Sequence, residues 1–577
     1  MCLVFNTIVS LEKIPSSFKF GLITPVYKGK GKDPQVRGSY RGITLSSVLS
    51  KTLEFILLKR IIPILADENI PQLNQTGFQK GMSCSDAFFS CLEITSKYIR
   101  EGDTVYSCFY DLASAFDTVE YPVLLDHLFR AGVVGKTWRL IKNWYSNSSS
   151  CVKISGQSSR VISINRGVKQ GSVLSPILFL LVMDPILLTL KNKPCGLNVC
   201  GLYLGAFCHA DDIRSLASSK SDCSFQISSV NDFASTRGLT LSAKKCEAII
   251  SPPFRNAPLL LSGGDTHIPV SDAAKCLGVW WTSNLTCSIW IDSNIKKARG
   301  AFFARGKDLF QGKLNPLSSK KIIECCIMPV LMYGSESWIL NSTLLNKLES
   351  FQAELGRRIL HLHTTSSRRA CRIALHWPSM RARVLCSKFA FLLKLLNGDD
   401  SLSCQVFRSL AISNVESIQL IRQCRFLESY YGTNFTSDIL THPASFSSKS
   451  LKKNIIQLDY SMLLDEASLA PHLKYIVDIE TSHEFNWLRI WDSALDRGPS
   501  GTSCVLALLK LLGLRSFNNS CPFNSSCGLI ENHLGAHFLT NHTELSINLS
   551  DCATALINNS NNVIIYGQTL HNSFFKS

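Results

Sequence analysis

The sequence has no uninterrupted apolar run long enough to cross a membrane. Its most apolar stretch, Val173 to Leu190, contains Pro176, Asp184 and Pro185, and we interpret it as a buried helix. The amino-terminal residues lack the basic, apolar and small-residue order of a secretory signal peptide. The 22 cysteines are scattered without regular spacing, which argues against a disulfide framework. We therefore expect an intracellular protein of the nucleus or cytoplasm, neither secreted nor bound to a membrane.

Acidic residues are scarce relative to basic ones. Lys and Arg number 60 against 43 Asp and Glu, which gives a formal net charge of +17. This excess favours a polyanionic partner, and a merely basic, soluble surface is the simpler alternative. With 577 residues, 45% of them hydrophobic and 18% charged, the chain can fill several packed domains, which argues against global disorder.

Two short segments place carboxylates where strands end. Asp111 follows the apolar run Thr104 to Tyr110, and Asp211 and Asp212 follow the run Leu202 to His209. Asp is a common strand terminator, so either segment alone indicates only a turn. If the two strands are neighbours in one sheet, however, the carboxylates meet and can share two Mg²⁺ ions about 3.5–4 Å apart. That arrangement would suit nucleotidyl transfer.

Glycine-rich loops around these strands suit contact with phosphates or flat rings. Lys28 and Lys32 flank a loop in which Gly and Lys alternate, and Gly171 lies in a loop before an apolar helix. Lys245 follows the second acidic segment, and a Lys beside such a site can protonate a leaving pyrophosphate. Each of these features alone is more often an ordinary surface loop or lysine.

Several segments, taken in their order along the chain, resemble the reverse transcriptase of non-LTR (LINE-type) retrotransposons. The segments that carry the resemblance are Pro25-Val-Tyr-Lys28 with Tyr40-Arg41-Gly-Ile43, Asn74-Gln75 with Gly77-Phe78, Gly81 and Ser83, Asp111 with Ala115-Phe116-Asp117, Gly167 with Gln170-Gly171-Ser172 and Ser175-Pro176, and Ala210-Asp211-Asp212. Cys276-Leu277-Gly278-Val279 and Tyr333-Gly334-Ser-Glu336-Ser-Trp338 also look like that family. Any one motif is weak, but their ordered coincidence makes a chance match improbable.

The resemblance implies an α+β right-hand polymerase. It implies fingers and palm over residues 1–282, a helical thumb over 283–398, and a mostly helical carboxyl-terminal region of uncertain role over 399–577. It implies that Asp111, Asp211 and Asp212 bind two Mg²⁺ ions, with Mn²⁺ as the alternative. These three residues, together with Lys245 as the acid, would form the catalytic set. The residues implied to contact the dNTP are Lys28, Lys32, Arg41, Phe116, Gln170 and Gly171. Phe116 would be the steric gate under the sugar, and its simpler interpretation is a core aromatic.

The sequence departs from the family pattern at three positions and at its start. His209 stands where Tyr or Phe is usual, Gly42 replaces a proline, and Ser242 stands where Asn is common; none of these removes a metal ligand. Met1 falls inside what looks like a family segment that precedes the fingers, and no endonuclease region is present. The resemblance therefore leads us to expect an amino-terminally truncated product without an endonuclease.

Basic helices follow the expected palm. The residues expected at the template-primer are His209, Lys296, Lys297, Arg299 and Arg305, and such contacts should depend on salt. Farther on, Cys521, Cys527, His537 and His542 have roughly the order of a degenerate zinc knuckle over 521–542, but the spacing is loose. We favour the interpretation that these are unrelated Cys and His residues scattered in polar loops.

The sequence thus predicts an RNA-directed DNA polymerase that uses an RNA template, a DNA primer and dNTP. Two alternatives stay open, namely a catalytically inactive nucleic-acid-binding remnant of a retroelement and a maturase-like RNA-binding protein. The retained carboxylates favour the enzyme. The sequence gives no indication of the oligomeric state or of the RNA that is copied.

Overall fold

The structure is a computed structural model of the 577-residue chain. It describes residues 1–470 apart from 30, 194, 243, 254–257, 307–313, 315 and 399, together with 473, 477, 480 and 481. Four of the expected site residues, Cys521, Cys527, His537 and His542, lie outside the described residues. The chain divides into two units, and each is described by itself.

Unit 1 comprises residues 1–286 and 399–418 and contains both helices and strands, so the predicted α+β class is confirmed. Its helices are α1 (Cys2–Leu11), α2 (Ser16–Lys19), α3 (Val48–Asp67), α4 (Cys84–Arg100), α5 (Ala115–Thr118), α6 (Tyr121–Arg130), α7 (Gly135–Tyr145), α8 (Ser175–Met183), α9 (Pro185–Lys191), α10 (Lys220–Thr236) and α18 (Leu402–Asn414). Short 3-10 turns occupy η1 (Arg37–Ser39) and η4 (Val415–Ser417).

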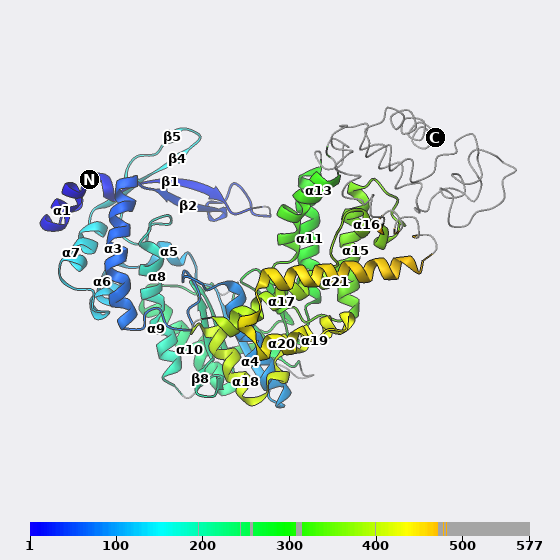
Figure 1. The fold of residues 1–577 in the computed structure, drawn as a ribbon. Coiled ribbons are helices and arrows are strands. Elements are labelled where there is room, and N and C mark those ends of the chain that lie inside the picture. The colour runs from blue at the N-terminus through cyan, green and yellow to red at the C-terminus, as the bar shows by residue number, and fades with distance from the viewer. Residues whose placement is uncertain are drawn as a thin grey trace, which may run out of the picture. The chain divides into compact units, whose positions relative to one another are not determined.

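The strands of unit 1 form two main sheets. One has the order β2 (Tyr40–Leu45), β1 (Phe20–Tyr27), β4 (Ser148–Ile154) and β5 (Gln157–Ser158), with β6 (Ile162–Ile164) also on β4. The other has the order β11 (Glu247–Ser251), β3 (Val105–Tyr110), β10 (Asp212–Ala217) and β9 (Ala206–His209), and every neighbour in it is antiparallel. Figure 1 shows β1 and β2 as a long hairpin with β4 beside it.

Three small two-stranded sheets complete unit 1. They are β7 (Asn198–Val199) with β8 (Leu202–Tyr203), β12 (Leu260–Gly263) with β13 (Thr266–Pro269), and β14 (Ala273–Cys276) with β15 (Val279–Thr282). One apolar core joins α3, α8 and the β3–β10 sheet, with members that include Leu53, Leu57, Phe179 and Ile213.

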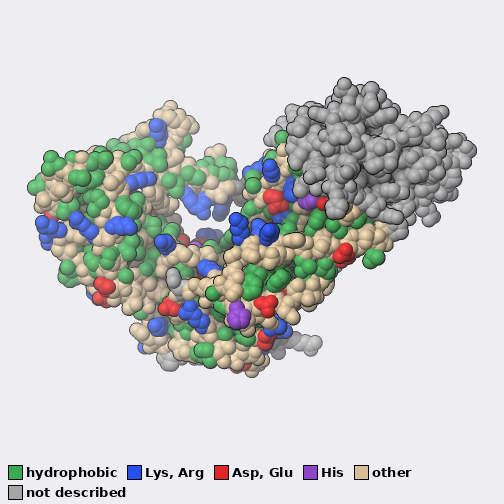
Figure 2. All heavy atoms as spheres, viewed as in Figure 1, with side chains coloured by type: hydrophobic (Ala, Val, Ile, Leu, Met, Phe, Trp, Pro, Cys, Tyr) green, Lys and Arg blue, Asp and Glu red, His purple; other side chains and the backbone are tan. Residues whose placement is uncertain are grey.

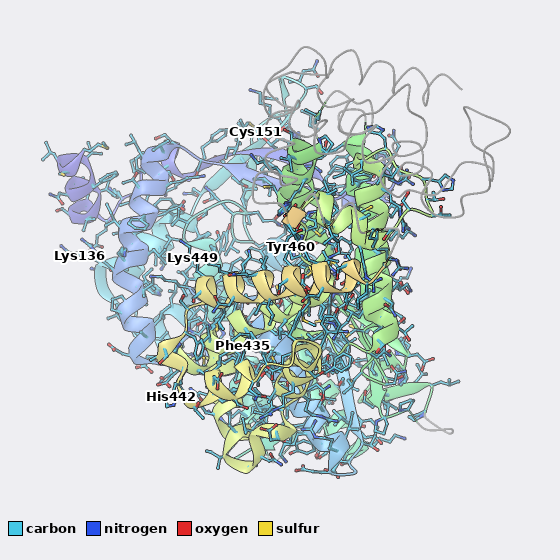
Figure 3. The ribbon with its side chains drawn as sticks, turned by 45° about the vertical axis from the view of Figure 1, so that its right-hand side comes forward. Lys136, Cys151, Phe435, His442, Lys449 and Tyr460 are labelled. Atoms are coloured by element: carbon cyan, nitrogen blue, oxygen red, sulfur yellow. The ribbon has the colours of Figure 1, made fainter. Side chains whose placement is uncertain are left out.

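Unit 2 comprises residues 287–398 and 419 onward, and its described elements are helical. They are α11 (Ser288–Ala304), α13 (Pro316–Ile322), the π-helical η2 (Ile323–Ile327), α14 (Met328–Leu331), η3 (Ser335–Ser337), α15 (Ser342–Ile359), α16 (Arg368–Ala374), α17 (Met380–Asn397), α19 (Gln419–Glu428), η5 (Ser429–Tyr431), α20 (Phe435–Thr441), η6 (Pro443–Ser445) and α21 (Ser448–Ser468). Figure 3 shows α21 with Lys449 and Tyr460 on it. The Tyr460 ring stacks on His376 at 4.8 Å between centroids.

The apolar stretch from Val173 to Leu190 differs from our expectation of one buried helix. It forms two helices, α8 and α9, which are separated at Asp184, and Pro185 is the first residue of α9. Proline lacks the N–H that would continue the hydrogen bonds of α8, so the helix is interrupted there although the Asp184 backbone is itself helical. No helix of the described part of the chain has the length and apolar character needed to cross a membrane.

A buried carboxylate ties α18 to α4 within unit 1. Asp86, in the first turn of α4, accepts hydrogen bonds from the backbone N and Oγ of Ser83 at 2.9 and 2.7 Å. Its other oxygen accepts one from Ser403 Oγ of α18 at 2.7 Å. Asp86 is fully buried, so these hydrogen bonds compensate the loss of hydration of its charge.

We expect Asp86→Ala to lower the free energy of unfolding by about 3 kcal/mol, because it removes a helix cap and the hydrogen bond from Ser403, whose buried hydroxyl keeps only its longer contact with Ser401 at 3.3 Å. Urea unfolding measures this loss. The matched control is Asp222→Ala, at the same position of the first turn of the capped helix α10 but only half-buried. Equal losses in the two variants would contradict the role given to Ser403.

Candidate active site

Sheet register brings three carboxylates to one end of the β3–β10 sheet. Asp212 pairs with His209 across the β9–β10 hairpin, so Ala210 and Asp211 form its turn. On the other side of β10, Ile213 pairs with Tyr110 of β3, and Asp111 is the next residue along the chain. The two acidic segments are therefore on neighbouring strands.

Burial and mutual repulsion perturb these acids. Burial, and the negative charge of Asp111, raise the pKa of Asp211 above its ordinary value, while Lys245 and His209 oppose the rise. Asp212 is partly open to solvent, yet the surrounding protein atoms and then the charges of Asp211 and Asp111 raise its pKa to about 6. Clustered acids of this kind occur where a cation or a proton is handled.

Lys245 lies at the same site. Its Nζ donates to both carboxylate oxygens of Asp111, at 2.7 and 3.0 Å. The loop before it is held against β3, since the Ser242 N donates to the Asp111 carbonyl at 2.8 Å. Lys245, predicted from the sequence as an acid, therefore contacts a carboxylate that was predicted as a metal ligand.

A segment whose role the sequence did not show holds the turn of the hairpin. Gln75 Oε1 accepts from the backbone N of Ala210 at 2.9 Å and from that of Gly77 at 3.0 Å. A Cβ on Gly77 would lie 2.3 Å from the Ala210 N, so only glycine fits this close approach. Ala210 has a positive φ of 59°, and these contacts stabilise that uncommon backbone conformation. The motif at 74–77 therefore supports the turn of the β9–β10 hairpin, which carries Asp211.

His209, where the family usually has Tyr or Phe, is half-buried on β9. Its Nδ1 is 3.0 Å from Thr76 Oγ1, and its Nε2 is 3.7 Å from Cys84 Sγ. The imidazole is therefore fixed by polar contacts on both sides, where an aromatic ring would rely on packing alone.

Phe116 packs at the floor of the site. Its ring stacks on Phe179 of α8 at 4.2 Å and 16°, and meets the Phe78 ring edge-on at 5.9 Å. It is half-buried, so one part of the ring joins the core while another part stays accessible.

The loop at 167–171 lies against this floor. Its backbone N atoms at Gly167 and Val168 donate to the carbonyls of Val119 and Phe116, at 2.7 and 2.8 Å. Gln170 Nε2 donates to Asp117 Oδ1 at 3.0 Å. Gly171 has φ of 116° and leaves no room for a Cβ, which would lie 2.7 Å from the Thr44 carbonyl.

The three basic residues expected at the triphosphate, Lys28, Lys32 and Arg41, lie on or between β1 and β2, in the other sheet, and are exposed. The Nζ of Lys28 donates to the Gly38 carbonyl at 2.8 Å, which fixes it within its own loop. The Lys32 carbonyl accepts from the Tyr27 hydroxyl. Their contact with a nucleotide stays a prediction.

The expected template-primer residues of unit 2 are exposed on α11 or at its end: Lys296, Lys297, Arg299 and Arg305. Arg299 also donates to Glu354 of α15 at 2.7 Å. Sequence reasoning missed Phe303, which is 48% exposed on the same helix and has the Arg358 guanidinium 5.1 Å over its ring. Lys and Arg side chains are conspicuous on the face drawn in Figure 2.

The fit to divalent cations follows from the donor chemistry. Carboxylates of Asp111, Asp211 and Asp212 are the hard oxygen ligands that Mg²⁺ prefers. Burial first, and then the charges of the neighbouring carboxylates, raise the pKa values of Asp211 and Asp212, and a bound cation would oppose both effects. Across the described ranges, no group of three His, Cys, Asp or Glu side chains is placed so that it could hold a metal ion.

The raised pKa of Asp212 predicts a pH dependence of stability. Between the ordinary Asp value of 3.8 and about 6, the folded state binds more protons than the unfolded state, so the free energy of unfolding falls as pH rises. Asp212→Asn removes this contribution. We expect the variant, without divalent cations, to be more stable than wild type at pH 7 and similar to it near pH 4. Urea unfolding across pH measures the difference.

The control for that series is Asp265→Asn, on the exposed turn between β12 and β13. The difference in free energy of unfolding between this variant and wild type should be the same at pH 4 and at pH 7. An Asp212→Asn effect that stays constant over the same range would contradict the pKa assigned to Asp212.

Comparison with known proteins agrees with this geometry. Residues 28–281 match the family described as reverse transcriptase (RNA-dependent DNA polymerase). The RNA-directed DNA polymerase from mobile element jockey of Drosophila funebris is 27% identical over 377 residues, 62% of this chain and 39% of that protein. The Pol polyprotein from the type-1 retrotransposable element R2 of Popillia japonica is 25% identical over 52% of this chain and 51% of its own length.

Among solved structures, telomerase from Candida tropicalis in complex with a fragment of telomeric RNA covers 72% of this chain and 67% of its own, with a TM-score of 0.36 and 12% identity. The chain spans two fifths to one half of the two curated relatives above. The family match agrees with the expected right-hand polymerase fold. Residues 28–281 thus match the reverse transcriptase family, and the chain is similar in sequence to the polymerases of non-LTR retrotransposons.

Proposed function

We propose that this chain is the RNA-directed DNA polymerase of a retrotransposon, which extends a DNA primer from dNTP along an RNA template. The observation that carries the proposal is the meeting of Asp111, Asp211 and Asp212 at one end of a sheet inside the matched domain. The proposed place of action is inside the cell, in the nucleus or cytoplasm, where RNA and dNTP are present.

In this proposal, residues 1–282 are fingers and palm and residues 283–398 are the thumb. Residues 399–577 form a further region, and its segment 399–418 supports the palm because α18 packs on α4. Lys28, Lys32 and Arg41 would hold the triphosphate. Gln170 and Gly171 would line the nascent base pair, and Phe116 would contact the incoming sugar.

The reaction joins the primer 3′-oxygen to the α-phosphorus of the dNTP and breaks the bond from that phosphorus to the pyrophosphate. The primer hydroxyl loses its proton, and the pyrophosphate gains one. Two Mg²⁺ ions, or Mn²⁺, bound by the three carboxylates would lower the pKa of the 3′-hydroxyl and neutralise the phosphates. Lys245, paired with Asp111 in the structure, would give a proton to the leaving group. Positioning and charge neutralisation supply the rest of the acceleration.

The main test is incorporation of labelled dNTP on a primed homopolymer RNA. Asp211→Asn should lower the rate by about 10³-fold, because the loss of about 4 kcal/mol of charge stabilisation costs tenfold per 1.36 kcal/mol. Binding of the template-primer, followed by fluorescence anisotropy, should change little. Asp232→Asn, an exposed acid on α10, is the matched control.

A second candidate function is a nucleic-acid-binding protein without turnover. The engagement of both Asp111 oxygens by Lys245 favours it, because an ion pair there competes with a metal ion. If wild-type protein binds the primed RNA and incorporates nothing with Mg²⁺ or Mn²⁺, this second function replaces the first.

The proposed thumb predicts a salt-dependent contact. Lys296→Ala together with Lys297→Ala should weaken template-primer binding and reduce the slope of log affinity against log salt by about 1 to 2. The slope falls because binding with fewer phosphate contacts releases fewer counterions from the nucleic acid. Titrations at several salt concentrations measure the slope. Arg130→Ala, an exposed cation of α6 in unit 1, is the control. An unchanged slope would remove α11 from the nucleic-acid interface.

A further inference from the structure

A buried glutamate lies behind the loop that would line the nascent base pair. Glu54 occupies a position of α3 that faces the core, beside Leu53 and Leu57, and it is fully buried. Its Oε2 accepts from Ser172 Oγ at 2.8 Å and from the Val173 N at 2.5 Å. Burying a carboxylate is costly unless it is hydrogen-bonded, so an apolar residue would be expected here if packing were the only requirement.

The loop held by Glu54 is also bound to two other parts of the site. On one side, the Thr44 N of β2 donates to the Gln170 carbonyl at 2.7 Å. On the other side, Val168 N donates to the Phe116 carbonyl, and the Gln170 side chain donates to Asp117. Glu54 contacts the carboxyl-terminal end of the same loop. The loop therefore has fixed attachments along its whole length.

A second connection runs from Glu54 to Phe116 through α8. Val173 lies two residues before Ser175, where α8 begins, and α8 carries Phe179. The Phe179 ring stacks on Phe116 at 4.2 Å, so the position of α8 sets the floor on which Phe116 rests. A shift at Val173 would therefore move both neighbours of Phe116, namely the loop and the stacked ring.

We propose that Glu54 is a positioning residue that sets nucleotide affinity and the choice between deoxyribonucleotides and ribonucleotides. It would do so by fixing residues 170–173 and the start of α8, and through them Gln170 and the Phe116 ring. The proposal rests on the proposed polymerase function, since it assigns Glu54 to the nucleotide side of that site. Glu54 itself touches neither the substrate nor the reacting atoms.

The test compares Glu54→Leu and Glu54→Gln with wild type in single-nucleotide incorporation. For Glu54→Leu, we expect KM for dNTP to rise about tenfold, equivalent to about 1.4 kcal/mol, while kcat falls less than threefold. The ratio of kcat/KM for dNTP to that for rNTP should also fall about tenfold. For Glu54→Gln, both KM and this ratio should lie between the values of wild type and Glu54→Leu, because the amide oxygen of Gln can still accept from Ser172 and Val173.

Two further variants separate positioning from general stability. Ser172→Ala leaves Glu54 in place and removes one of its two hydrogen bonds, so it should shift KM in the same direction by a smaller factor. Glu349→Gln, in unit 2, removes the charge of a half-buried carboxylate that accepts from two backbone N atoms, those of Met380 and Arg381. It should lower stability without changing the dNTP to rNTP ratio.

Hydrogen exchange gives a readout that needs no activity. Amides 168–173 should exchange at least tenfold faster in Glu54→Leu than in wild type, while amides of α10 stay unchanged. Unchanged protection of 168–173 overturns the proposal, as does an unchanged dNTP to rNTP ratio in an active Glu54→Leu enzyme. One outcome separates the two proposals. If wild type incorporates no nucleotide, and amides 168–173 nevertheless exchange faster in Glu54→Leu, the polymerase function fails and the anchoring by Glu54 stands.

Discussion

The pairing of β3 with β10 is the constraint on which the site depends. Their register places Asp111 beside the turn that carries Asp211 and Asp212. Burial of these carboxylates, and then the repulsion between their like charges, raise the pKa values of Asp211 and Asp212. Folding must therefore hold the carboxylates together by forces from elsewhere, because nothing in the acids themselves favours their meeting. Lys245 supplies one compensating charge, and bound cations would supply more.

The remaining support comes from neutral hydrogen bonds to a strained turn. Gln75 Oε1 binds two backbone N atoms, and Asn74 Nδ2 binds the carbonyls of Tyr203 and Ala206 at 3.0 and 2.7 Å. These side chains are buried, so their hydrogen bonds form away from water and fix one geometry. The turn can therefore keep its positive φ at Ala210 while it carries the half-buried carboxylate of Asp211 beside it.

The sequence predicted elements whose signals are local. Helix α4 begins at Cys84 because Ser83 and Asp86 form a cap within a few residues of sequence, and the strand expected over Thr104 to Tyr110 differs from β3 by one residue. Sequence order and likeness to a family also pointed to the carboxylates. The supports were not predictable, because Gln75 and Ala210 are 135 residues apart and Glu54 and Ser172 are 118 apart. A polar residue on an apolar helix face gives no indication of its distant partner.

The return of α18 to unit 1 illustrates how such long-range contacts organise the chain. Residues 399–418 belong to unit 1, although the segments before and after them belong to unit 2. Asp86 can hold this segment because one of its oxygens caps α4 while the other accepts from Ser403. A single buried carboxylate thus satisfies a local and a distant requirement together. Since α4 also carries Cys84, which faces His209, α18 supports the helix that lies against the β9–β10 hairpin.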